Sequence, residues 1–185
     1  MMFSKQTEDF VRAALDFCIM IEHANDAGKE EFVDNMCKIL PLLYIKATVA
    51  PQAEEEFEPE LESRVTELMY NRIEQKLADL MGEDNMFLET FHPDIQLSDS
   101  PVAVKISENL ADIWQDLGNF IEIFKNGEKK TMSDSTTLCI INFKKFWGQK
   151  LVNVLRALHC IKYKSFLIMA MIALLFAACA TPCGC

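Results

Sequence analysis

Apolar side chains recur at spacings of three and four residues along five separate stretches of this 185-residue chain. Such spacing puts them on one face of an α-helix, because the helix turns once in about 3.6 residues. No strand-like alternation persists anywhere, and the links between the stretches are short. The sequence therefore predicts an all-α fold, an antiparallel bundle of about five helices with an apolar C-terminal tail.

The expected helices cover residues 7–24, 29–49, 61–81, 99–125 and 133–162. Pro41 should kink or split the second helix, because proline lacks the amide hydrogen that an interior helix position donates. Residues 82–100 are expected to form an ordered loop, and Asp99-Ser100-Pro101 has the capping residues that open the fourth helix. We place an acidic helical domain at residues 5–162 and the apolar tail at 163–185.

Charge is divided unevenly along the chain. From Met1 to Glu122 there are 9 basic and 26 acidic residues, whereas from Ile123 to Cys185 there are 9 basic and 2 acidic residues. An acidic body repels phosphate backbones, so we expect no nucleic-acid binding. The opening "MMFSKQTEDF" has acidic residues and no apolar block, so no secretory signal is expected there and a reduced, cytoplasmic domain is predicted.

Glu108, Asp112 and Asp116 follow one another at a spacing of four, which places three carboxylates on one helix face. A divalent metal could bind there through oxygen, as in helical pyrophosphohydrolases. A second acidic helix with matching pairs is missing, however, because Glu74 and Asp79 are five apart. The alternatives are a protein-docking surface or a face paired with basic residues of the last helix, since like charges at this spacing repel.

Other reactive groups are sparse. His92-Pro93-Asp94 could place an acid–base group in the loop, and Cys179, Cys183 and Cys185 could hold a soft metal at the end of the tail. Neither has the ligand spacing of a structural zinc site. Phosphate loops, dinucleotide-binding turns and nucleophile elbows are absent from the sequence, so no catalytic residue and no cofactor are predicted.

The tail resembles a bacterial lipoprotein export signal placed at the wrong end of a protein: Lys162 and Lys164 precede the apolar run, which ends in small residues and Cys179. At ~1.5 Å per residue the fifteen residues 166–180 reach about 22 Å, short of a ~30 Å hydrocarbon core. Three interpretations remain open: an anchor in the inner membrane, a segment that packs back on the bundle, or a reading frame that continues into a neighbouring lipoprotein gene. The residues that would contact lipid are Phe166, Leu167, Ile168, Ile172, Leu174, Leu175 and Phe176.

Three stretches carry a family resemblance: "GEDNMFLETFHPD" (82–94), "ISENLADIWQDLGNF" (106–120) and "FWGQKLVNVLRALHCI" (146–161). They resemble an uncharacterised bacterial family known as domain of unknown function 5063, over residues 8–161. The resemblance implies an all-helical domain and brings no activity with it. The segment beyond Lys164 departs from the family pattern.

Two functions are consistent with these features. The first is a non-enzymatic interaction or adaptor module that binds an unknown protein partner, with Glu108, Asp112 and Asp116 as one surface and the tail as a membrane contact. The second is a metal-dependent helical hydrolase that acts on a phosphorylated small molecule, with the same three carboxylates as ligands. Amphipathic helices without a reactive constellation favour the first.

Overall fold

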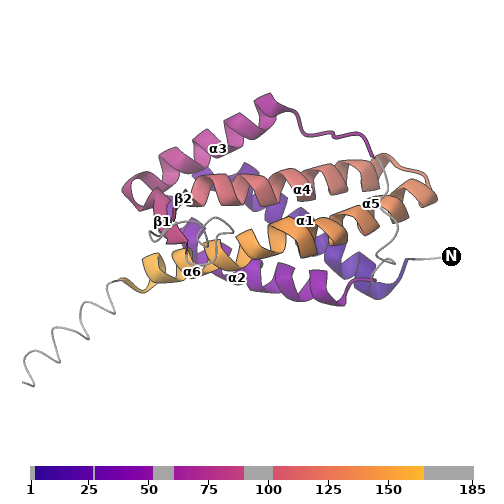
Figure 1. The fold of residues 1–185 in the computed structure, drawn as a ribbon, viewed down its shortest axis with the longest axis horizontal. Coiled ribbons are helices and arrows are strands. Elements are labelled where there is room, and N and C mark those ends of the chain that lie inside the picture. Colours follow the sequence, from indigo (N-terminus) through magenta and orange to yellow (C-terminus); the bar gives the residue numbers. More distant parts are fainter. Residues whose placement is uncertain (1–2, 27, 52–60, 90–101, 165–185) are drawn as a thin grey trace, which may run out of the picture.

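The computed structural model describes residues 3–26, 28–51, 61–89 and 102–164. Its helices form an antiparallel bundle around α4 (Ile106–Asn126), which packs against α1 (Lys5–Glu22), α3 (Glu67–Met81), α5 (Lys129–Asn142) and α6 (Gly148–Lys162) (Figure 1). The all-α prediction is confirmed, with one small sheet added to it.

The first helical pair follows the predicted pattern closely. Ser4 caps α1 by accepting a hydrogen bond from the backbone nitrogen of Thr7 at 3.1 Å. After the 3-10 turn η1 (Ala24–Asp26), α2 (Gly28–Val49) runs through Pro41 as one helix, so of the two expected effects, a kink or a split, the split does not occur. Leu40 and Leu43, both fully buried, flank the proline. Their burial, about 1.5–3 kcal/mol each, offsets the ~3 kcal/mol that an interior proline costs.

The third helix begins six residues later than predicted. Thr66 caps α3 by accepting a hydrogen bond from the backbone nitrogen of Met69 at 3.3 Å. The preceding segment, residues 61–65, crosses α4 at Gly118, where a Cβ atom added to the glycine would lie only 3.1 Å from Val65 Cγ2. A glycine on α4 therefore lets the crossing segment approach closely.

A two-stranded sheet replaces part of the expected loop and the first turn of the expected fourth helix. After the 3-10 turn η2 (Gly82–Asn85), β1 (Met86–Glu89) pairs antiparallel with β2 (Val102–Lys105), with Met86 opposite Lys105 and Glu89 opposite Val102. The helix therefore starts at Ile106, not at Asp99. Residues 90–101, with His92 and Asp94, lie outside the described part of the chain.

In place of the single last helix that was predicted, the structure has two helices, and a helical turn joins them without interruption. The π-helical turn η4 (Phe143–Trp147) connects α5 to α6, and Trp147 is fully buried with its indole nitrogen donating to the Cys139 carbonyl at 3.1 Å. Gly148 has no room for a side chain, since a Cβ would lie 2.5 Å from the Phe143 carbonyl oxygen and 2.9 Å from its ring. The π-helical turn η4 therefore accommodates the Trp147 indole next to Gly148, which has no side chain.

Candidate functional site

The acidic row on α4 lies on the side of that helix that faces α3, α5 and α6. Glu108 is exposed, whereas Asp112 and Asp116 are partly buried. The three carboxylates therefore share a helix face as predicted but lie in different environments. The hydrogen-bond and ion-pair partners of each carboxylate determine which chemistry is open to it.

Asp112 joins three helices. Its Oδ1 accepts a hydrogen bond from the Tyr70 hydroxyl of α3 at 2.8 Å, and its Oδ2 forms an ion pair with the Lys150 ammonium of α6. The expectation that a basic residue of the last helix lies near the acidic row is met by Lys150. Burial, and then the hydrogen bond to Asp112, raise the pKa of the Tyr70 hydroxyl above its ordinary value.

Asp116 of α4 is hydrogen-bonded to the last residue of α5. Its Oδ1 accepts a hydrogen bond from Asn142 Nδ2 at 2.7 Å. Burial raises the pKa of this carboxyl above its ordinary value, the Asn142 hydrogen bond opposes the rise, and the charge of Asp112 adds to it. Asp116 also lines a cavity of about 100 Å³ beneath the crossing segment, together with Asn119 and Ser135. A space of this size suits a few water molecules and is too small for a drug-sized ligand.

These contacts bear on the metal hypothesis. Both carboxylate oxygens of Asp112 are engaged by the phenol and the ammonium group, and the Lys150 charge is paired with this carboxylate. In the part of the chain that the structure describes, no three His, Cys, Asp or Glu side chains are grouped to hold a metal ion. The arrangement is that of a salt-bridged helix face, which ties three helices together.

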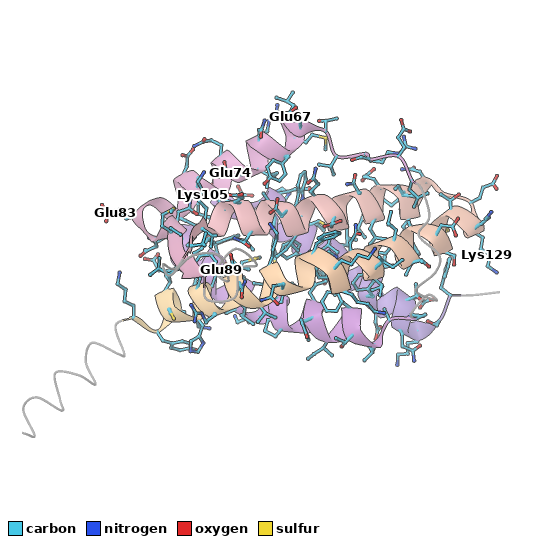
Figure 2. The ribbon with its side chains drawn as sticks, in the orientation of Figure 1. Glu67, Glu74, Glu83, Glu89, Lys105 and Lys129 are labelled. Carbon is cyan, nitrogen blue, oxygen red and sulfur yellow. The ribbon has the colours of Figure 1, made fainter. Side chains whose placement is uncertain are left out.

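A second polar cluster, which the sequence analysis missed, lies at the end of the bundle where α4 begins. Ser107, fully buried, donates to Glu74 Oε1 at 2.9 Å and accepts from Asn85 Nδ2 at 3.0 Å, while its backbone nitrogen donates to Asn85 Oδ1 at 2.9 Å. Lys105 forms an ion pair with the same glutamate at 3.5 Å, and Figure 2 shows the two side chains together. This cluster fixes η2 and α3 to the first turn of α4.

Glu89 is a buried acidic residue at the same end of the bundle. It is 7% exposed and accepts a hydrogen bond from Asn153 Nδ2 of α6, and Gln149 Nε2 donates to Asn153 Oδ1 at 3.3 Å. Figure 2 places Glu89 beside α6. No sequence signal marks Glu89 and Asn153 as partners, because they are 64 residues apart. Over the described ranges, every buried side-chain nitrogen and oxygen has a hydrogen-bond partner, so the buried polar groups of these clusters are satisfied within the fold.

The remaining candidates concern the tail. Residues 165–185, including Phe166, Leu167, Ile168, Ile172, Leu174, Leu175, Phe176 and the three terminal cysteines, lie outside the described residues. Within the described residues, none of the helices combines the length and the apolar character that a membrane crossing requires. The two lysines before the tail are both engaged: Lys162 with Asp34 at 2.6 Å and Lys164 with Asp84 at 3.5 Å.

The comparisons with known proteins agree with this architecture. The fold and its polar clusters define a helical bundle, and the chain belongs to the family described as "Domain of unknown function (DUF5063)", which matches residues 1–164. The resemblance stated from the sequence is therefore confirmed. The chain is similar to the crystal structure of protein BF1032 from Bacteroides fragilis, with 40% identity, a TM-score of 0.75, and coverage of 87% of this chain and 94% of that one. None of the curated proteins matches this chain.

Proposed function

We propose that this chain is a non-enzymatic protein-interaction module whose docking surface is the outer face of α2. The observation that carries the proposal is a row of aliphatic side chains on that face: Leu42, Ile45 and Val49 are 42%, 56% and 53% exposed. We call these three residues the α2 stripe. Spacings of three and four put them in line on one side of the helix.

The stripe suits the apolar side of another helix. Such a row forms a ridge that packs into the groove of a second helix, and helix-in-groove recognition reads anchors at this spacing. Aliphatic side chains left in water gain about 25 cal/mol for each Å² that a partner covers. We therefore commit to an amphipathic helix of a partner protein as the ligand of the α2 stripe.

The rival function, a metal-dependent hydrolase acting on a phosphorylated small molecule, has less support. It requires Glu108, Asp112 and Asp116 to converge on one cation, whereas the oxygens of Asp112 are engaged by Tyr70 and Lys150. Calorimetry with Mn²⁺ or Mg²⁺ separates the two functions. We expect no binding heat and no shift of the thermal midpoint, and saturable heat that Asp112→Asn abolishes would favour the hydrolase.

Photo-crosslinking tests the interaction module. A photoreactive phenylalanine analogue at position 45 of the full chain should give one discrete adduct in cells. The matched control is position 68, because Leu68 is also aliphatic, is 69% exposed and lies on α3. The adduct partner, once purified, should bind the parent chain and fail to bind a Leu42→Glu/Val49→Glu variant. Equal adducts at positions 45 and 68, or binding unaffected by the double variant, would contradict the proposal.

Localisation is a separate prediction. A cytoplasmic domain attached to the inner membrane through residues 165–185 should move from the membrane to the soluble fraction when these residues are deleted. A protein that stays in the membrane fraction without them would refute attachment by the tail.

A further inference from the structure

The π-helical turn η4 lies beside the α2 stripe. The ring of Tyr44, on α2, and the ring of Phe143, the first residue of η4, are in edge contact with centroids 5.2 Å apart. Tyr44 directly precedes Ile45 of the stripe, and Phe143 directly precedes two exposed lysines, Lys144 and Lys145. The ring contact therefore brings the turn that carries these lysines next to the stripe.

The charged residues along this part of α2 and along η4 and α6 are basic. Residues 38–49 contain two lysines and no acidic residue, and residues 143–164 contain lysine and arginine but neither aspartate nor glutamate. Lys38 lies four residues before Leu42, which places both on one side of α2, and 67% of its side chain is exposed. We call the three exposed lysines beside the stripe the basic border: Lys38, Lys144 and Lys145.

Lys38 also has a carboxylate partner within the domain, Asp34, which lies one turn earlier on the same helix. Exposed ion pairs within one helix are weak, so a carboxylate of another protein can share or replace this contact. Asp34 would keep its second partner, because Lys162 of α6 lies 2.6 Å from it. The basic border can therefore turn toward a ligand without leaving an unpaired carboxylate behind.

The chain as a whole has the opposite sign, with a formal net charge of −10. A ligand that carries carboxylates is repelled by most of this surface and attracted beside the stripe, which directs it to this face. An anionic membrane is a less suitable occupant, because a flat surface would also meet Glu31, which is exposed and lies seven residues before Lys38 on α2. A helix that crosses α2 at the stripe can stay clear of Glu31.

We propose that the partner helix is acidic: glutamate or aspartate residues flank its apolar side, and the basic border of the α2 stripe selects it. This inference rests on the proposed function, because it names the chemistry of the ligand of the same stripe. The aliphatic side chains supply the buried contact, and the lysines determine which amphipathic helix is accepted.

Two synthetic helical peptides test the proposal against the purified full chain, with binding measured by fluorescence anisotropy. Both carry leucine at positions i, i+3, i+4 and i+7, so that each has one apolar side. The acidic probe has glutamate at the flanking positions, and the basic probe has lysine there. At low ionic strength the acidic probe should bind at least about tenfold more tightly than the basic probe, and the difference should shrink as salt screens the charges.

Charge-reversal variants show whether the basic border causes this preference. Lys144→Glu/Lys145→Glu should abolish it, because the sign of the charge beside the stripe is reversed. The matched control is Lys129→Glu/Lys130→Glu, which changes the net charge equally at two exposed positions that begin α5, where Figure 2 shows Lys129 at the tip of the bundle. The control should keep the preference of the parent chain.

Several results would overturn the proposal. Equal affinity for the two probes, or tighter binding of the basic probe, would exclude an acidic partner and leave docking on the stripe in place. No binding of the acidic probe, or binding that survives Leu42→Glu/Val49→Glu, would also contradict it. Binding to phosphatidylglycerol vesicles that Ile45→Glu abolishes would assign the stripe to a membrane. The crosslinking test in cells uses no probe peptide, so it decides on the interaction module independently.

Discussion

The side-chain oxygen Oδ1 of Asn119 lies 2.7 Å from the backbone nitrogen of Val65 and fastens the segment before α3 to the central helix. The same oxygen accepts from the backbone nitrogen of Arg64 at 2.7 Å and from Ser63 Oγ at 3.1 Å. One amide oxygen thus receives three donors, of which the Ser63 hydroxyl also lies 3.1 Å from the Val65 carbonyl oxygen. This contact explains why residues 61–65 do not continue the helix toward the N-terminus.

Replacement of Asn119 by leucine should lower the free energy of unfolding by about 1–3 kcal/mol, because the partly buried Val65 nitrogen and two exposed donors lose their acceptor. Urea unfolding followed by circular dichroism measures the change. Asn119→Asp keeps an oxygen in place and should stay close to the parent at neutral pH. Equal loss in both variants would mean that the side chain contributes through packing alone.

The Tyr70 hydroxyl should titrate above the ordinary tyrosine pKa of 10.0. Its proton is retained by burial and by the hydrogen bond to Asp112, which raise the pKa in the folded state. The contribution to stability is therefore present below the ordinary value near 10 and is lost as the pH rises through the folded pKa. A Tyr44→Phe/Tyr163→Phe background leaves Tyr70 alone for ultraviolet titration, and Asp112→Asn should lower its pKa. If Asp112→Asn left the Tyr70 titration curve unchanged, the result would contradict the hydrogen bond between Tyr70 and Asp112.

The ion pairs of Asp34 should make the stability fall in acid. Hydrogen bonds from Lys162 and Lys38 lower the pKa of this carboxyl from 3.8 to about 2. A lowered pKa stabilises the fold above the ordinary value, and this contribution disappears as the pH falls toward about 2. Carbon-detected NMR titration should find the low pKa, and Lys162→Gln should raise it. Lys125→Gln, which removes a lysine that pairs with Glu122, should leave it unchanged.

Gly148→Ala should be one of the most costly small substitutions. The new methyl group would lie 2.5 Å from the Phe143 carbonyl oxygen and 2.9 Å from the Phe143 ring, so the π-helical turn must shift. We expect a loss of about 1–3 kcal/mol in the free energy of unfolding, typical of overpacking. Lys144→Ala, at an exposed position of the same turn, should change it by less than about 0.5 kcal/mol. If Gly148→Ala left the free energy of unfolding unchanged, the π-helical turn would be able to shift without cost.

The helices with the longest regular stripes could be predicted from the sequence. Ile106, Leu110, Ile113 and Leu117 of α4 all prove fully buried, as the spacing of three and four requires. The start of α3 differs from the prediction for a physical reason. Val65 extends the apolar spacing of that helix but packs on Gly118 from an extended segment, while Leu68, within the predicted stripe, is 69% exposed.

The two-stranded sheet and the π-helical turn could not be predicted, because the sequence pattern that would indicate each of them is too weak. The strands read MFLE (β1) and VAVK (β2), so neither shows the alternation of apolar and polar residues that predicts a strand. The π-helical turn keeps Phe143 and Trp147 on the apolar side, so the pattern reads as one helix. The Glu89–Asn153 contact depends on the packing of β1 against α6, which local pattern does not encode.

Helix α4 touches α1, α3, α5 and α6, and the order in which hydrogen exchanges with solvent follows from that position. An element enclosed by four others cannot open alone, so its amide protons should exchange only when the whole domain unfolds. The slowest-exchanging amides of α4 would therefore report the global free energy of unfolding directly.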